Sequence, residues 1–399
     1  MEETATAPPR GRYRALLATP HARRLIASGL LARLPMGMVP LALLLVVRDA
    51  GGGYAAAGIV SGAYLVAVGL GAPVAGRLVD RRGQTRILVT RAVLNPALLL
   101  TAAALAVADA PFAAVGVAAV AAGALLPPVG SSLRAIWPRL LEGPQLRATA
   151  YALEASLQEI FFVVGPLVVA VVATLVAPAA ALAVAAVAGC VGTLIFASSP
   201  PVRAWRPERE PEEAGRFGAL GAAGVRTIVL FGVCVGVAFG GAEVGMPAFA
   251  EEHGDAALGG IPLALFAAGS LVGGLVVGAR GNLDPRTLLR IASILLAVGL
   301  APLIVAPSLP ALAVLAFVAG LPIAPAFASS YGLIDRVARR GTQAEAFAWI
   351  GTSVSAGIAV GAAFGGAAID AWGVPAAFAL GCGGAAVGAL IAAVGPGLD

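Results

Sequence analysis

The stretch GRLVDRRGQTR, residues 76 to 86, is a charged loop between two long apolar runs. Five of its eleven residues are charged, and Gly76 and Gly83 bracket the cluster. The apolar runs on either side are about 20 residues long, which is enough for a helix to cross the hydrocarbon core of a bilayer. The stretch therefore indicates a point where the chain leaves a membrane and turns back into it.

The composition of the whole chain supports this interpretation. Its 399 residues are 59% hydrophobic and 12% charged, with a mean hydropathy of +0.93, whereas soluble domains are about 45–50% apolar and about 25% charged. A β-barrel would alternate polarity in segments of about 10 residues, and a soluble fold would need more polar helix faces. We predict an all-α membrane protein with twelve spans, near residues 25–47, 55–77, 86–108, 111–136, 150–175, 179–198, 226–250, 257–279, 288–306, 309–334, 345–369 and 373–394.

The N-terminal region does not read as a secretory signal. Residues 1–24 are polar and contain arginines, and the apolar run after them is too long. We therefore expect the first span to be retained. The three cysteines fall inside spans without metal-ligand spacing, which predicts free thiols at Cys190, Cys234 and Cys382.

The arginines predict the orientation, because all 26 basic residues are arginine. If the N-terminus is cytoplasmic, 24 of them lie on the cytoplasmic side, Arg48 lies outside and Arg33 lies within the first span. The positive-inside rule then places both termini in the cytoplasm, and we expect the protein in the cell membrane. The net charge of +5 suits the anionic inner leaflet of the bilayer. No soluble region is large enough to suggest binding to nucleic acid.

A proline- and charge-rich segment, residues 198–221, divides the spans six and six. It predicts a flexible connection, with an N-terminal six-helix bundle over residues 1–198, a cytoplasmic linker over 199–224 and a C-terminal bundle over 225–399.

The two halves are also related in sequence. A shift of 198 residues superposes six matching positions, which are Gly76 on Gly274, Arg82 on Arg280, Gly83 on Gly281, Pro127 on Pro325, Ser131 on Ser329 and Ser132 on Ser330. Two parallel repeats of six helices are typical of one large class of transporters.

The opening stretch closely resembles the loop 2–3 signature of the major facilitator superfamily. The matching residues are Gly76, Leu78, Asp80, Arg81, Gly83 and Arg86. In the second half, residues 274–286 keep the glycines but have Gly278 where the aspartate would stand. The resemblance implies a major facilitator fold of two six-helix bundles related by a pseudo-two-fold axis.

Asp80 is the least expected residue of the loop. It lies at the carboxyl end of the second span, where the helix dipole disfavours an anion. A salt bridge to Arg81 or Arg77 would offset this. The resemblance implies instead that Asp80 docks on the N-terminal end of span 11, with Arg134 and Arg139 beside it, and closes the cytoplasmic side. The segment TQAE, residues 342–345, predicts a capping box at that helix end.

The fifth span contains Gly165 and Pro166. Exporters of the superfamily often have a glycine-rich pattern ending in Gly-Pro at this place, and only the last two residues are present here. The alternative is an ordinary proline kink, which membrane helices tolerate.

Four ionisable residues lie inside predicted spans, where such residues are costly and usually functional. They are Arg33, Glu154, Glu159 and Glu243. At 1.5 Å per residue, the depth of Arg33 allows it to meet either glutamate of span 5. We expect Glu159 to carry the proton with Arg33 as its modulator, and Glu154 is the alternative carrier. For Arg33 and Glu159 a structural ion pair is the alternative, and Glu243 suits either an outer vestibule or a structural role.

The substrate is expected to be lipophilic or amphipathic, because the spans offer few amide side chains for hydrogen bonding. The resemblance implies a cavity between spans 1, 4, 7 and 10, and methionines suit adaptable contacts there. Lipophilic cations should depend most on Glu243. The candidate lining residues, some of which could simply pack helices, are Met36, Met38, Trp137, Phe239, Met246, Phe327 and Tyr331.

Together these features predict a monomeric, proton-coupled transporter that exports such compounds by alternating access. Uptake of a small metabolite by proton symport is the alternative. A channel or a membrane-embedded enzyme is a more distant one, since the sequence has no metal cluster, nucleophile–base pair or phosphate loop. We expect no cofactor, with the proton gradient as the driving force and the lipid bilayer and a small molecule as partners.

Overall fold

The computed structural model describes residues 9–207, 217–253, 256–281 and 283–398. Within these ranges, twelve helical segments are long and apolar enough to span a membrane, which confirms the predicted number. The boundaries differ by a few residues. The predicted span 150–175, for example, is helical over Pro144–Leu175.

The first half of the chain forms α1 (Pro9–Ala18), α2 (Ala22–Arg33), α3 (Pro35–Asp49), α4 (Tyr54–Arg82), α5 (Gln84–Val107), α6 (Phe112–Ala124), α7 (Val129–Leu140), α8 (Pro144–Leu175), α9 (Pro178–Ala197) and the short α10 (Pro200–Ala204). The second half forms α11 (Ala223–Glu252), α12 (Gly260–Arg280), α13 (Pro285–Leu300), α14 (Leu309–Gly320), α15 (Ile323–Val337), α16 (Gln343–Trp372) and α17 (Val374–Val394), with 3-10 turns at Gly218–Gly221, Ala256–Gly259 and Ala301–Val305.

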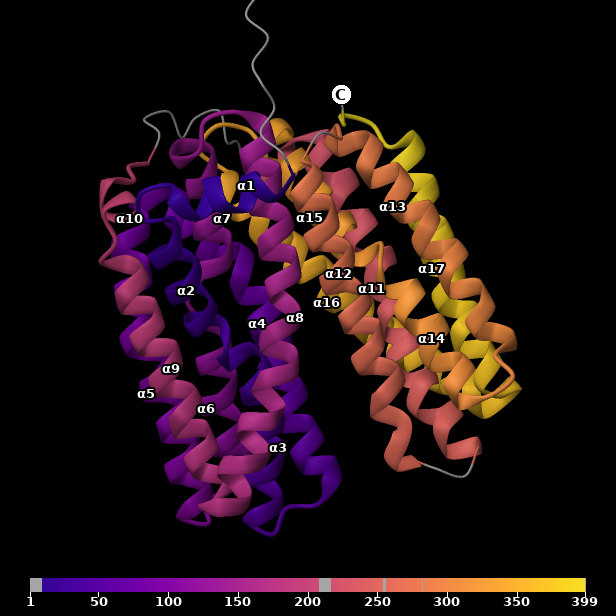
Figure 1. Cartoon of the computed structure of the whole chain (residues 1–399). Helices are drawn as coiled ribbons and strands as arrows, with labels where there is room; N and C mark the ends of the chain where they lie inside the picture. The colour runs from indigo at the N-terminus through magenta and orange to yellow at the C-terminus, as the bar shows by residue number, and fades with distance from the viewer. Residues whose placement is uncertain (1–8, 208–216, 254–255, 282, 399) are drawn as a thin grey trace, which may run out of the picture.

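The helices form two bundles, and the described residues contain no strand, so the predicted all-α class is confirmed. Figure 1 shows α2 to α9 in one bundle and α11 to α17 in the other. The bundles lie together at the end that contains α1 and the described C-terminus, and they diverge toward the opposite end (Figure 1). We name the first of these the arginine-rich end, since the loops with most of the arginines lie there.

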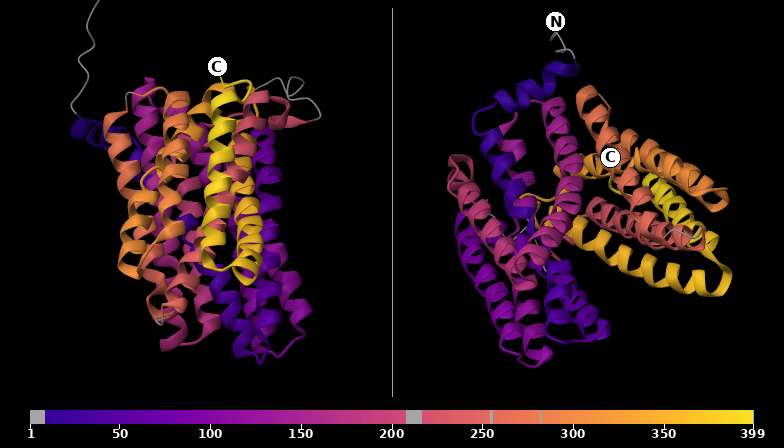
Figure 2. Two further views of the ribbon diagram at one scale, coloured as in Figure 1. Left: turned by 90° about the vertical axis from the view of Figure 1, so that its right-hand side faces the viewer. Right: turned by 60° about the horizontal axis from the view of Figure 1, so that its bottom comes forward.

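The connection between the bundles is described only in part. It begins with α10, and Arg203 lies in that short helix. Residues 208–216, which include Arg209 and Arg216 of the predicted linker, lie outside the described residues. Figure 2 shows the two bundles from the side and from the diverging end.

Three spans are interrupted in the middle, namely the first at Leu34, the fourth at residues 125–128 and the tenth at residues 321–322. Proline stands at or beside each break and removes a backbone donor there. In the fourth span, Arg91 of α5 donates to the carbonyls of Ala124 and Leu126, both at 3.0 Å. The freed carbonyls are therefore satisfied by a neighbouring helix, as a membrane interior requires.

The bundles meet along two seams. In the first seam α4 packs against α16, and in the second α8 packs against α12 and α15. The shift of 198 residues relates α4 to α12 and α8 to α16, so the two seams are counterparts in the repeat. A Cβ at Gly76 would lie 2.6 Å from the carbonyl oxygen of Ala344, and one at Gly274 would overlap the Ser156 hydroxyl. Glycine therefore permits a close approach in both seams.

Candidate functional site: closed seams and buried charges

Asp80 joins the two bundles at the first seam. Its carboxylate is buried, and its two oxygens accept the backbone N–H groups of Ala344 at 3.1 Å and Glu345 at 2.9 Å. These groups belong to the first turn of α16, where unpaired N–H groups and the helix dipole favour an anion. The Asp80 carboxylate is thus disfavoured by the dipole of its own helix, α4, but stabilised by the N-terminal turn of α16.

Glu345 could repel Asp80 at the same helix end, and Arg77 offsets its charge. The Arg77 guanidinium donates to both Glu345 carboxylate oxygens, at 3.0 and 2.7 Å. The predicted capping box does not form, because the Thr342 side chain donates to the Arg339 carbonyl and caps no N–H of α16. A carboxylate from the other bundle takes the place of the local cap.

The remaining residues of the loop, and Arg139 at the end of α7, do not contact α16 in the same way as Asp80. Gly83 ends α4 with φ at +88°, a conformation that favours glycine. Arg81 and Arg86 are exposed. Arg139 lies over the Trp205 ring at 4.9 Å and donates to the Arg206 carbonyl.

Arg134 does not dock at Asp80, and that expectation is corrected. Its guanidinium lies deeper in the bundle, where it contacts Glu154, Gln158 and the ring of Tyr331. Arg134 is in the second turn of α7, so the break in the fourth span places it well inside the bundle rather than at the loop.

Glu154 is the centre of a buried charge cluster, with 1% of its surface exposed. It accepts Arg33 at 3.4 Å, is paired with Arg134 at 3.3 Å and accepts the Trp137 indole N–H at 2.7 Å. The cluster contains two guanidinium groups and one carboxylate. In a low-dielectric interior such an ion group must be well paired to be stable.

The predicted action of Arg33 on Glu159 is also corrected, since Arg33 pairs with Glu154 instead. The two glutamates are five positions apart, which turns their side chains apart by about 140° around the helix. Glu154 thus faces α2 and α7, whereas Glu159 faces the other bundle.

Two polar contacts of α8 cross between the bundles at mid-depth. The Ser270 hydroxyl of α12 donates to Glu159 at 2.8 Å, and the Tyr331 hydroxyl of α15 donates to Gln158 at 3.0 Å. Glu159 is half-buried, and it lies close enough to Glu243 of α11 for the charges of the two side chains to interact. The Glu243 side chain is exposed.

The predicted cavity residues divide into two groups. Met38 and Met246 are completely buried in the cores of their bundles, and Trp137 is buried against Glu154, so these three pack the protein rather than line an open space. Met36, Phe239 and Phe327 are half-buried, and Tyr331 is buried in an aromatic array. Ring centroids 6.0 to 6.3 Å apart connect Phe266, Phe239, Phe327, Tyr331 and Phe347.

Gly165 has a packing role in α8. A Cβ there would lie 2.6 Å from the carbonyl carbon of Gly37 in α3, and a Cβ at Gly37 would overlap the Phe161 carbonyl. The two glycines allow α3 and α8 to cross closely. Pro166 lies inside α8, which continues from Pro144 to Leu175 without interruption.

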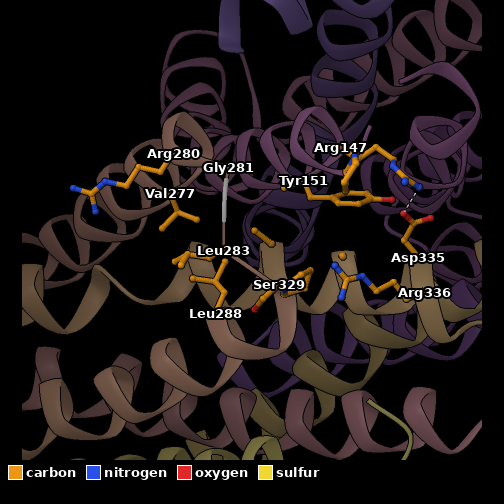
Figure 3. A pocket seen from close by; sticks show the side chains of 15 residues that line it. Arg147, Tyr151, Val277, Arg280, Gly281, Leu283, Leu288, Ser329, Asp335 and Arg336 are labelled. Atoms are coloured by element: carbon orange, nitrogen blue, oxygen red, sulfur yellow. Dashed lines mark hydrogen bonds and ion pairs between the residues drawn. The ribbon is translucent and has the colours of Figure 1, made fainter. Parts of the chain in front are cut away.

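A pocket of about 140 Å³ lies in the second seam at the arginine-rich end. Figure 3 shows Tyr151 projecting toward the ion pair between Arg147 of α8 and Asp335 of α15, which are 2.9 Å apart. Nearby, Thr149 donates to the Gly278 carbonyl at 2.8 Å. Gly278 is the position where the repeat would place an aspartate, so this seam is closed without a counterpart of Asp80.

Several of these residues were not predicted, among them Arg77, Arg91, Arg147, Gln158, Ser270 and Asp335. Arg77 lies within the loop stretch and was considered only as a partner of Asp80, so its pairing with Glu345 was not predicted. Ser270 and Asp335 acquire their roles only because another bundle packs against them. Among the described residues, no group of three or more His, Cys, Asp or Glu side chains could hold a metal ion.

Comparisons with known proteins agree with this architecture. The sequence matches the Major Facilitator Superfamily over residues 25–280 and 228–396. No curated protein matches it in sequence. Its fold is similar to that of the human organic anion transporter TETRAN, with 16% identity, 97% of this chain and 100% of the other covered, and a TM-score of 0.70.

Two microbial structures are similar to the same degree. A bacterial homologue of the iron transporter ferroportin, in its outward-facing state, is 13% identical over 93% of this chain and 98% of its own, with a TM-score of 0.73. The E. coli fucose:proton symporter is 14% identical over 95% of this chain and 98% of its own, with a TM-score of 0.71.

Proposed function

The chain belongs to the major facilitator superfamily, and from this premise we propose that it is a proton-coupled exporter of lipophilic or amphipathic small molecules. It works by alternating access, as a monomer in the cell membrane, with no cofactor. We assign the arginine-rich end to the cytoplasm by the positive-inside rule. The arrangement with the bundles joined at that end is then outward-facing.

The bond between Glu159 and Ser270 carries the proposal of proton coupling. It joins α8 to α12 at mid-depth, so it breaks when the bundles rock apart at the arginine-rich end. The carboxyl group then exchanges a hydroxyl donor for another environment. Such a change alters its affinity for a proton, which is what a coupled carrier requires. Glu154 is less suited, because two arginines and Trp137 hold its charge in place.

The surroundings of the acids support an amphipathic substrate. Phe239 and Phe327 are half-buried and offer apolar faces, while Glu159 and Glu243 supply carboxylates that can bind a proton or a cation. A substrate with a positive group competes with protons for those carboxylates. Because protons and substrate compete for the same carboxylates, the protein exchanges protons for substrate. An inward proton gradient then drives the substrate outward.

The test is gradient-driven flux of lipophilic cations in proteoliposomes. Glu159→Gln should abolish accumulation against a gradient, because the amide cannot exchange a proton, while substrate binding remains. Glu252→Gln removes an acid from the exposed end of α11 and serves as the matched control. Normal gradient-driven flux in Glu159→Gln would exclude this residue as the carrier.

Proton symport is a second candidate, and one observation favours it. Arg33 Nη2, Arg134 Nη1 and Gln158 Nε2 form no hydrogen bond in the part of the chain that is described. These are all donors, so they suit an acidic substrate, which would bind best when Glu159 and Glu243 are protonated. The direction of substrate flux under an inward proton gradient separates the two candidates, since antiport gives export and symport gives uptake.

A further inference from the structure

The pocket in the second seam has walls from both bundles. Arg147 and Tyr151 come from α8, Arg280 from the last turn of α12, and Ser329 and Arg336 from α15 (Figure 3). The pocket therefore exists only while the arginine-rich ends of the bundles lie together. None of these residues belongs to the proposed proton and substrate site.

The lining of the pocket carries a net positive charge. It contains the three arginines Arg147, Arg280 and Arg336, against the single carboxylate of Asp335. Asp335 pairs with Arg147, and Arg336 pairs with Asp284 at the start of α13. Although desolvation acts in the opposite direction, hydrogen bonds from Arg336 and from backbone N–H groups hold the pKa of Asp284 below its usual range. Arg280 forms no ion pair within the described residues and is exposed.

Unused donors surround the same space. The Tyr151 hydroxyl has no hydrogen-bond partner although the residue is only 1% exposed, and the buried Nε of Arg147 has none either. Gly281 lines the pocket, and the Nη1 of Arg12 beside it is likewise buried and unpaired. Buried polar groups without partners are costly, and these three can all donate. The missing partner is an acceptor with several oxygens and a negative charge.

The internal repeat also indicates that an anion would be accommodated at this seam. At the first seam, a carboxylate from α4 occupies the N-terminal turn of α16. At the second seam, the counterpart turn is that of α8, which begins at Pro144 and has no side-chain cap, and position 278 is glycine. Asp335 pairs with the Arg147 side chain, so the second seam lacks a carboxylate on the backbone N–H groups of that turn, where the first seam has Asp80.

We propose that this pocket binds the phosphoryl group of an anionic phosphate ester or of free phosphate, and that its occupant stabilises closure of the arginine-rich end. Basic pockets between membrane helices on the cytoplasmic side are suited to lipid head groups. The apolar wall at Leu283, which is 44% exposed, and Val277 leaves room for an acyl chain. The effect on conformation rests on the proposed alternating access, whereas binding itself does not.

The effect on conformation follows from linkage. A ligand that contacts both bundles binds the closed state better than the open state, so it shifts the population toward closure. Anionic lipid at the inner leaflet would then act on the outward-facing state without entering the transport pathway.

Binding is measured directly on the full-length protein, by native mass spectrometry after incubation with phosphatidylglycerol or phosphatidylcholine, and by competition with inorganic phosphate. We expect tighter retention of phosphatidylglycerol, because the lining is positive. Arg280→Gln and Tyr151→Phe should each weaken it roughly tenfold, which is the effect of one charge-assisted hydrogen bond. Arg340→Gln removes the same charge from an exposed position outside the pocket and should change nothing.

If millimolar phosphate releases the lipid, the site binds the phosphoryl group alone. If the lipid is retained, its head group is also anchored by the acyl chain. Equal retention of the two lipids would overturn the proposal, as would equal losses in Arg280→Gln and Arg340→Gln. The measurement involves no transport, so a failure of proton-coupled export would leave it unaffected.

Discussion

At the scale of single residues, Asp80 shows how one carboxylate can be unfavourable in its own helix and favourable in the fold. Both of its oxygens accept N–H groups of α16, so the protein needs two acceptors and a negative charge there. In Asp80→Asn one oxygen becomes an NH₂ group that faces an N–H donor. We expect the closed seam to lose about 1.5–3 kcal/mol, the range for hydrogen bonds to charged groups, and the population to shift toward inward-facing.

The shift is measured with a cysteine at Thr352, whose hydroxyl donates to the Gly69 carbonyl across the first seam. A maleimide added from the cytoplasmic side should label Thr352→Cys faster in the Asp80→Asn background. Arg82→Gln, an exposed position two residues away, serves as the control. Equal labelling rates and normal transport in both backgrounds would exclude a closing role for Asp80.

Glu154 is expected to act on stability. Glu154→Gln leaves Arg33 and Arg134 buried without their counter-ion, and breaking a buried ion pair in this way costs about 3–5 kcal/mol. The thermal midpoint of the purified protein should fall, and Glu251→Gln at the exposed end of α11 should not lower it. Adding Arg33→Gln should recover part of the loss, because it removes one uncompensated charge. A midpoint in Glu154→Gln equal to that of the control would show that the cluster is not a structural ion group.

At the scale of elements, Gly37 and Gly165 set the distance between α3 and α8. Gly165→Ala should destabilise the protein by about 1–3 kcal/mol, because the new methyl group overlaps the backbone of α3 and the helices must separate. Gly62→Ala is the matched control, since a Cβ there meets nothing within 4 Å and alanine favours helix. Thermal unfolding separates the two, and equal midpoints would contradict the close crossing.

The helices were largely predictable from the sequence, whereas the packing around their interruptions was not. Apolar length alone located twelve spans, since a bilayer requires about 20 residues for each. The break in the fourth span depends on Arg91 and Asn95 of α5, which satisfy the carbonyls that it frees. Pro127 and Pro128 mark the break within the fourth span, but no local pattern there identifies its partners in α5. For the same reason Arg134 was predicted to lie beside the loop. The break in the fourth span instead places its side chain inside the bundle.

At the scale of the whole molecule, the repeat predicted that two halves exist, and packing decided which residues join them. The motif identified Asp80 because its position repeats in a known family. Nothing comparable marked Ser270 or Asp335, whose partners lie in the other bundle. Charges that act across a seam carry no periodicity along the chain, which is why the candidate site was predicted less completely than the fold.

The ion pair between Arg147 and Asp335 supplies a test of closure that involves both bundles. In Arg147→Asp two carboxylates face each other across the second seam, and in Asp335→Arg two guanidinium groups do, so each single change should open the arginine-rich end. The double variant restores opposite charges and should close it again, which is the coupling that a double-mutant cycle measures.

Spin labels at positions 82 and 340, both exposed and on different bundles, report the separation of the two ends. We expect a longer mean distance in each single variant and a return toward the original distance in the double variant. If the double variant is as open as the singles, the pair does not hold the seam. Closure would then rest on the bonds of Asp80 and Glu345 at the first seam, which also join the two bundles at this end.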